Sequence, residues 1–271
     1  MHPRVLPKLS LRDIYVAPRS SPVDSRSQVC LKATHAFKAS RQEWSGVPLI
    51  VECRSIPPFI KNDYIHMLPR SANRPMATGG LPQWMSQTDR YMLRCGINDL
   101  SHVDAIASRL MDQGTPLKLL CVEVDNPYYR KVPSLLGRLR ERHPGAALFS
   151  SPVASPEVVE TLVKDCGVDV VRVGSDKTLG AGVGFPQFSA LLECGEVARE
   201  HGALVANDSE ICNISDLPKA FCAGASFAVL HNPNDLLIED AENALRSACT
   251  FLGARSIKDI GNDCTFYHTH M

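Results

Sequence analysis

Acidic and amide side chains stand where one apolar run of this chain ends, a position from which they could act on a substrate. Glu123, Asp125 and Asn126 lie at and just after the end of the run at residues 117–124. Paired carboxylates at a strand end could exchange protons with a bound molecule as general acid and base. They could equally be polar residues that bond to neighbouring loops. The spacing predicts a candidate acid cluster and no particular reaction.

Two other segments carry residue types that bind ions. Residues 175–184 are rich in glycine and follow a strand-like run, so their N–H groups could cradle an anion, but they match neither common phosphate-loop motif in register. Cys264, His268 and His270 have the types of zinc ligands at a spacing that matches no known zinc site. We expect a shortened loop, an ordinary tail, and no bound metal or cofactor.

Apolar runs that alternate with helical periodicity must position these residues. Continuous apolar runs are typical of strands buried on both faces of a parallel sheet. Alternating strands and helices form βαβ units, and eight units close a barrel. We predict an α/β fold, a single-domain (β/α)8 TIM barrel, with an open doubly wound sheet as the alternative. The candidate strands are residues 47–53, 75–78, 91–95, 117–124, 146–150, 168–173, 203–207 and 226–230.

Helix boundaries are clearest in the second half of the chain, where capping residues, proline and glycine mark starts and ends. The predicted helices are residues 100–113, 155–167, 186–201 and 216–223. The predicted organisation is a polar lead-in at residues 1–46, the barrel at residues 47–260 and a tail at residues 261–271.

Composition limits the environment and the partners of the chain. The 271 residues include 29 Lys+Arg and 29 Asp+Glu, so no basic excess favours nucleic acid, and no run approaches the roughly 18 apolar residues of a membrane span. The ten cysteines form no C-x-x-C pair, which is typical of thiols in a reducing compartment. We expect an intracellular protein, cytoplasmic or organellar, with a mitochondrial address left open by the basic N-terminal residues.

Three stretches carry longer motifs. They are GVGFPQFSALLECGEVAREHGALVANDSEICNISDLPKAFCAGASFAVL at residues 182–230, LRSACTFLGARSIKDI at residues 245–260, and LRDIYVAPRSSPVDSRSQVCL with EWSGVPLIVE within the first 52 residues. Together they resemble the GMP reductase branch of the IMP dehydrogenase/GMP reductase family. The resemblance implies a barrel, a cysteine nucleophile that adds to the purine, hydride delivery by NADPH, and homotetramers.

The chain departs from that pattern at the nucleophile. In the family, the cysteine lies on a loop between a V-G pair and the G-V-G-[YF]-P-Q motif. Here only seven residues separate Gly174 from Gly182, and none is a cysteine. Cys166 precedes the strand and Cys194 follows within the next helix, so neither reaches the loop tip. Without a thiolate the covalent adduct cannot form.

Two further elements of the family differ. The family's flap carries a glutamate between the eighth strand and the last helix, whereas only residues 231–244 are available here, too few for a lid. The lysine-bearing H-K-H-Y motif after the second strand corresponds to Ala77-Thr78-Gly79-Gly80 if residues 75–78 form that strand.

The phosphate site also differs. Where the family has S-D-G-G and L-G-G, this chain has Asn207-Asp208-Ser209-Glu210 and Leu230-His231-Asn232. Asp208 matches the ribose-binding aspartate, while Glu210 replaces a glycine beside the phosphate position. A like-charge contact at about 4 Å costs about 1–4 kcal/mol. The residual nucleotide-site positions are Gly174, Ser175, Gly182, Gly184, Asp208, Glu210, His231 and Asn232.

These departures predict a pseudoenzyme: a GMP reductase-like barrel that serves as a structural or assembly subunit of a larger protein complex. We expect a protein partner to contact residues 57–87, the proline-rich segment that departs most from the family; a homo-oligomer is the alternative. Two other functions stay open, a divergent NADPH-dependent purine nucleotide oxidoreductase and a regulatory module that binds a nucleotide without turnover.

Nucleotide affinity tests the altered phosphate site. Calorimetry with GMP or IMP is expected to show binding no tighter than about 1 mM. Glu210→Gly is expected to strengthen binding, because it removes the carboxylate and lets the backbone approach the phosphate. Micromolar binding by the unmodified protein would favour the regulatory module instead.

Overall fold

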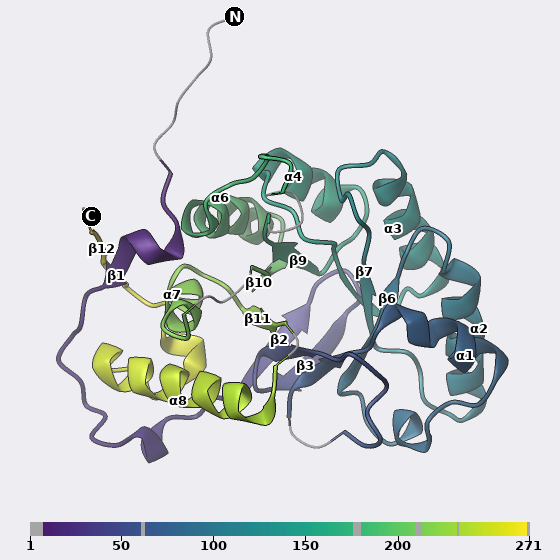
Figure 1. The fold of residues 1–271 in the computed structure, drawn as a ribbon, viewed down its shortest axis with the longest axis horizontal. Helices are drawn as coiled ribbons and strands as arrows, with labels where there is room; N and C mark the ends of the chain where they lie inside the picture. The colour runs from purple at the N-terminus through teal and green to yellow at the C-terminus, as the bar shows by residue number, and fades with distance from the viewer. Residues whose placement is uncertain (1–7, 61–62, 176–179, 210–212, 232, 270–271) are drawn as a thin grey trace, which may run out of the picture.

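Eight parallel strands close into a barrel in the computed structural model, which describes residues 8–60, 63–175, 180–209, 213–231 and 233–269 (Figure 1). The strand order is β10-β11-β4-β5-β6-β7-β8-β9, and β10 pairs with β9 to close the sheet. Closure confirms the predicted TIM barrel and excludes the open doubly wound sheet. The barrel strands are β4 (Leu49–Glu52), β5 (Ile65–Met67), β6 (Tyr91–Cys95), β7 (Leu119–Val122), β8 (Ala147–Phe149), β9 (Val170–Val173), β10 (Leu204–Asn207) and β11 (Phe227–Leu230).

Helices surround the barrel and bury one apolar face each (Figure 1). In α2, for example, Leu100, Val103, Ile106 and Leu110 are buried at helical spacing. No helix in the described part of the chain is long and apolar enough to cross a bilayer. The α-helices are α1 (Asn73–Thr78), α2 (Leu100–Asp112), α3 (Lys131–Arg142), α4 (Pro156–Lys164), α6 (Gln187–Glu200), α7 (Asp216–Cys222) and α8 (Asp235–Leu252); short 3-10 turns are η1 (Leu11–Asp13), η2 (Arg26–Gln28), η3 (Arg70–Ala72), η4 (Gln83–Ser86) and η5 (Ile257–Asp259).

The second barrel strand lies elsewhere than predicted. Residues 75–78 belong to α1, where Pro75 occupies the first turn and needs no backbone donor. The strand is β5, a three-residue segment in which Ile65 and Met67 are fully buried. Its shortness hid it in the sequence. The H-K-H-Y correspondence at residues 77–80 is therefore wrong, because the residues that follow this strand begin at Leu68.

An antiparallel hairpin covers the amino-terminal end of the barrel. Strands β2 (Ala33–Phe37) and β3 (Gln42–Gly46) come from the lead-in and pair with each other. The Phe37 ring packs against Phe149 at a centroid distance of 6.1 Å, and Trp44 packs against Phe227 at 5.5 Å. Phe149 and Phe227 belong to barrel strands, so the hairpin completes the core at this end.

Asp169 attaches the hairpin to the barrel. Its carboxylate, just before β9, accepts hydrogen bonds from the N–H groups of Ala39 and Ser40 at 2.9 and 3.0 Å. The same carboxylate accepts one from the Leu148 N–H and pairs with Arg140 at 2.6 Å. A fully buried carboxylate with four donors is stable only while they are all present.

Two short strands, one from the N-terminal and one from the C-terminal part of the chain, pair on the outside of the barrel. Strand β1 (Ile14–Val16) pairs antiparallel with β12 (Phe266–His268), and Tyr15 lies opposite Tyr267. The C-terminal tail is thus held against the N-terminal segment of the same chain.

Replacing the anchoring carboxylate tests this arrangement. Asp169→Ala is expected to lower the free energy of unfolding by about 3–5 kcal/mol, because it removes the carboxylate partner of Arg140 and the acceptor of three N–H groups. Urea unfolding measures the change. The exposed neighbour Asp165 supplies the control: Asp165→Ala should change stability by less than about 0.5 kcal/mol. Equal effects of the two substitutions would show that Asp169 is not the anchor.

Candidate functional site

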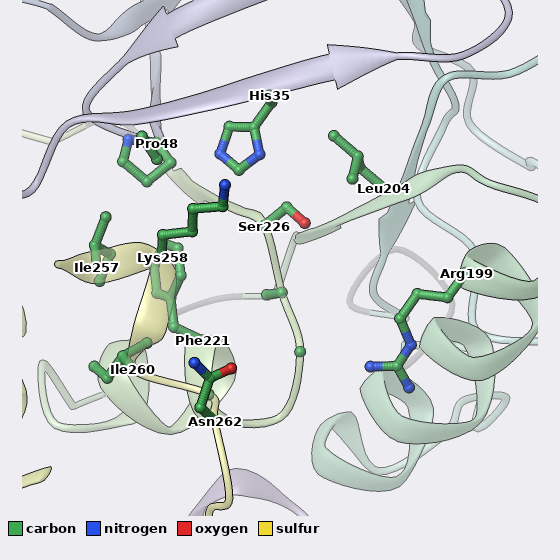
Figure 2. Close-up of a pocket in the computed structure, with 14 residues that line it drawn as sticks. His35, Pro48, Arg199, Leu204, Phe221, Ser226, Ile257, Lys258, Ile260 and Asn262 are labelled. Atoms are coloured by element: carbon green, nitrogen blue, oxygen red, sulfur yellow. The ribbon is translucent and has the colours of Figure 1, made fainter. Parts of the chain in front are cut away.

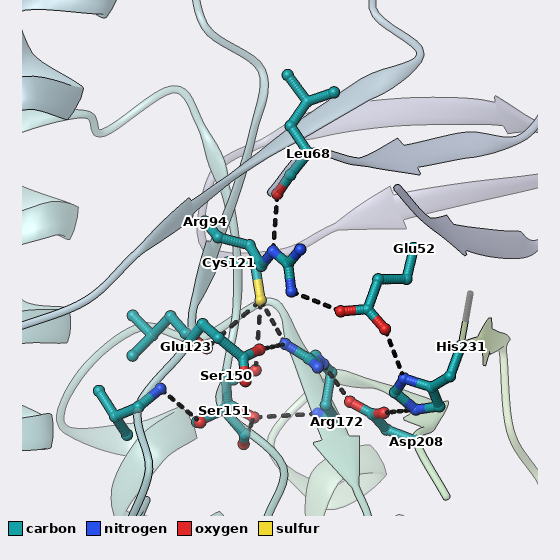
Figure 3. A network of polar contacts seen from close by, with 12 residues as sticks. Glu52, Leu68, Arg94, Cys121, Glu123, Ser150, Ser151, Arg172, Asp208 and His231 are labelled. Carbon is teal, nitrogen blue, oxygen red and sulfur yellow. Dashed lines mark hydrogen bonds and ion pairs between the residues drawn. The ribbon is translucent and has the colours of Figure 1, made fainter. Parts of the chain in front are cut away.

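Six side chains of alternating charge connect the carboxyl ends of the barrel strands (Figure 3). This end of a (β/α)8 barrel is where active sites lie. Each neighbour in the series is an ion pair, and the members come from β4, β6, β9 and the segments after β7, β10 and β11. In order, the series is Arg94, Glu52, His231, Asp208, Arg172 and Glu123. We call it the charge chain.

Arg172 is the most buried cation of the charge chain. It sits inside the apolar strand β9, and its side chain is 2% exposed. Its Nε donates to Asp208, and its Nη1 lies 2.9 Å from Glu123 Oε2. Burial disfavours the charged guanidinium, but the Asp208 carboxylate outweighs it and raises the pKa of Arg172. The residue therefore remains a cation held between two acids.

Asp208 receives cations from two directions. Its side chain is 1% exposed, with Arg172 on one oxygen and His231 Nε2 at 2.8 Å from the other. Burial alone would raise the pKa of Asp208, but the two cations lower it to about 2. The carboxylate is ionised at neutral pH, and both of its oxygens are engaged by this protein's own side chains.

His231 bridges two carboxylates. Its Nδ1 lies 2.9 Å from Glu52 Oε2, and Nε2 contacts Asp208. Burial would lower the pKa of His231, yet the two acids raise it to about 9. The His231 contact is the main cause that lowers the pKa of Glu52 to about 2. At neutral pH the imidazole is thus a cation, and the six charges of the chain sum to zero.

Arg94 ends the charge chain on the other side of Glu52. Its Nη1 lies 2.6 Å from Glu52 Oε1, and its Nε donates to the Leu68 carbonyl at 2.7 Å. Leu68 directly follows β5, so the charge chain also holds that strand end in place.

Neither Cys121, which contacts the site, nor Cys166 and Cys194, which flank the loop after β9 in sequence, is an activated thiol. Cys121 projects from β7 to within 2.6 Å of Arg172 Nη1, but complete burial raises its pKa. Burial also raises the pKa of Cys166 to about 11 and that of Cys194 to about 12. A nucleophilic cysteine needs a thiolate near neutral pH. These three residues are protonated thiols.

At the base of the glycine-containing loop, Gly174 permits close packing and Ser175 forms a hydrogen bond, whereas Gly182 and Gly184 lie in open space or at the surface. A side-chain carbon on Gly174 would lie 1.9 Å from the Asp208 carbonyl oxygen, so only glycine fits there. The Ser175 hydroxyl donates to the Phe185 carbonyl at 3.1 Å and closes the loop at its base. Gly182 has a positive φ of 69°, and Gly184 is exposed.

The structure divides the predicted acid cluster. Glu123 pairs with Arg172, whereas Asp125 is exposed. Asn126 accepts a hydrogen bond from the Tyr128 N–H at 2.9 Å, which stabilises its own turn. The three residues therefore do not form one acid–base site.

Some candidate residues of the nucleotide site and of the metal-like tail motif lie outside the part of the chain that the structure describes. Glu210, Asn232 and His270 lie outside the described residues. In the described part of the chain, no three His, Cys, Asp or Glu side chains lie close enough together to form a metal site.

Sequence reasoning missed Arg172, Arg94 and Glu52. A signal was present: each is a charged residue within or at the end of an apolar strand run. A charge in a strand buried on both faces needs an opposite charge beside it. The pattern could have identified these residues as paired, but not their partners.

Comparison with known proteins shows which protein family this chain is similar to. Residues 82–233, more than half of the chain, match the model of the IMP dehydrogenase / GMP reductase domain. The GMP reductase of Aeromonas hydrophila is 30% identical over 241 residues, and that of Shewanella pealeana is 29% identical over 243 residues. Each alignment covers 82% of this chain and 67% of the relative.

The raised pKa of His231 predicts a stability profile. Because that pKa is about 9 in the folded protein and about 6.5 in the unfolded chain, the bridge stabilises fully below about pH 6.5. Its contribution is lost as pH rises through about 9. Urea midpoints should therefore fall between these pH values more steeply in the unmodified protein than in His231→Gln. Parallel profiles would show that His231 does not link the two acids.

Proposed function

This chain belongs to the IMP dehydrogenase/GMP reductase family, and on that premise we propose that it is a pseudoenzyme of the GMP reductase branch. Its role is that of a structural or assembly subunit in a larger protein complex. In this proposal the barrel is a folded framework for the complex. The ion pairs at the carboxyl ends of its strands make that framework rigid and do not catalyse a reaction.

The state of Asp208 is the observation that carries the proposal. The resemblance assigns this position to the ribose of the nucleotide, yet its carboxylate is bound to Arg172 and His231. A ribose could reach it only by displacing the partly exposed His231 or the buried Arg172, and an unpaired Arg172 would cost about 3–5 kcal/mol. The site is therefore already occupied by the protein's own side chains.

Short connections support the same interpretation. Only residues 231–234 join β11 to α8, because the helix already begins at Asp235. This connection is shorter than the sequence suggested and leaves no room for a flap. The loop after β9 has no cysteine in its sequence, and the nearby Cys121 is a buried thiol.

The segment at residues 57–87 is our candidate for the contact with a partner. A hydrogen bond from the Trp84 indole to the Pro57 carbonyl at 2.9 Å ties the two ends of this segment together, and barrel strand β5 lies between them. The Phe59 side chain remains 54% exposed. A segment held in place with an exposed aromatic side chain suits a protein interface, where aromatic residues are enriched.

A divergent purine nucleotide oxidoreductase is the second candidate. It is favoured by one observation, that relatives at 29–30% identity over 82% of the chain are GMP reductases. It requires a hydride-transfer route that uses no cysteine at the loop after β9. A measurement of catalytic turnover therefore distinguishes the oxidoreductase from the pseudoenzyme.

Gentle purification of the native protein tests the proposal. We expect size exclusion to place the protein in a high-mass fraction with a different protein, with more than about 1,000 Å² buried between them. The same fraction, and the isolated chain, should show no turnover with GMP plus NADPH or IMP plus NAD. Phe59→Ser should release the partner, and the exposed Met111→Ser on α2 is the matched control.

Two results would overturn the proposal. Turnover in the usual enzyme range of about 1–10³ s⁻¹ would restore the oxidoreductase. A free monomer or a homotetramer in native extract would remove the complex.

A further inference from the structure

A pocket lies at the amino-terminal ends of barrel strands, whereas the charge chain lies at their carboxyl ends (Figure 2 shows the pocket). Its volume is about 340 Å³, within the range of small-molecule sites. Pro48, Leu204 and Ser226 line it at the amino-terminal ends of β4, β10 and β11. Hairpin strand β2 and the segment around η5 form its other walls. None of the residues that make up the charge chain contributes to this pocket.

The lining is basic. Lys258, Arg199 and His35 contribute nitrogen, and no aspartate or glutamate belongs to the described residues that line the pocket. Neither Lys258 nor Arg199 makes an ion pair or a side-chain hydrogen bond within the described ranges. By contrast, Arg172 and Arg140 each form an ion pair with an aspartate. Two cations that share one pocket without an acid leave a positive potential inside it.

His35 adds an unused polar atom. Its Nε2 is buried and has no hydrogen-bond partner among the described residues, and its ring packs on Phe227 at 4.5 Å. Burial and the nearby Lys258 lower the pKa of His35 to about 4, so the ring is neutral at physiological pH. In Figure 2 it points toward Ser226 and the Lys258 side chain. A neutral imidazole can donate one hydrogen bond to an oxygen of a ligand.

Apolar side chains complete the pocket. Phe221, Ile257 and Ile260 form a wall on the side of the pocket across from Arg199. A bare inorganic ion would leave this wall in contact with water, whereas an organic group would cover it. The chemistry therefore selects a molecule with an anionic end and an apolar body.

We propose that this pocket binds a small organic anion, a phosphate monoester or a carboxylate, with its charged group beside Lys258 and His35 and with Arg199 adding positive charge from the other side of the pocket. The charge is neutralised by the two unpaired cations, and the orphan Nε2 gains its partner. The apolar body lies against Phe221 and Ile257. Because the site is separate from the carboxyl ends of the strands, it does not depend on the proposed function.

Calorimetry at low salt tests the proposal on the full chain, with phenyl phosphate and benzoate as probes. Inorganic phosphate tests charge alone, and benzyl alcohol tests the apolar body alone. We expect at least one organic anion to bind with a Kd no weaker than about 1 mM. Inorganic phosphate and benzyl alcohol should each bind at least about tenfold more weakly, since each lacks one half of the recognised chemistry.

Variants locate the binding. Lys258→Met and Arg199→Met remove exposed side chains, so both should fold, and each should weaken binding at least about fivefold. Lys131→Met, on exposed α3, is the matched control and should leave affinity unchanged. No binding of either organic anion, binding unchanged in both pocket variants, or equal affinity for inorganic phosphate would overturn the proposal.

Discussion

Burial of the Arg172 guanidinium inside strand β9 is the constraint on which the carboxyl end of this barrel depends. A cation that is 2% exposed must be surrounded by acids, and Asp208 and Glu123 provide them from two other strand ends. Asp208 then needs a second cation, which is His231, and His231 in turn meets Glu52. Each pair makes the next one necessary, because an unpaired buried charge costs more than a pair stabilises. The strand ends are therefore joined by charge as well as by the hydrogen bonds of the sheet.

At the amino-terminal end of the barrel, a different requirement applies: the apolar interior must be covered. There the β2–β3 hairpin inserts Phe37 and Trp44 against Phe149 and Phe227, and Asp169 attaches the hairpin through its backbone N–H groups. The two ends thus differ in chemistry, with aromatic packing at one and paired charges at the other. In the pocket beside the hairpin, Lys258 and Arg199 make no ion pair with the described residues, which is the basis for proposing a ligand there.

Membership of the IMP dehydrogenase/GMP reductase family explains the barrel but not the contents of its carboxyl end. The sequences of the GMP reductases align with 82% of this chain at 29–30% identity. Function in such barrels depends on the strand-end residues and loops, which vary while the core is kept. Here these positions hold Asp208 and His231 in mutual contact. These charged groups are therefore neutralised by one another, which is the feature on which the proposed loss of turnover rests.

The sequence by itself determined the fold class, the family and every barrel strand except the second. Apolar runs and helix caps are local signals, and long motifs such as the one at residues 182–230 persist when single residues change. The sequence also determined that no cysteine stands in the loop after β9. Only the tertiary structure decided the position of β5, whose three residues are too few for a periodic pattern. It alone decided that His231 meets Glu52, 179 residues away, and that Arg172 meets Asp208. Such pairs form because barrel closure brings strand ends together. A local sequence pattern does not reveal which residues, far apart in the sequence, will then be in contact.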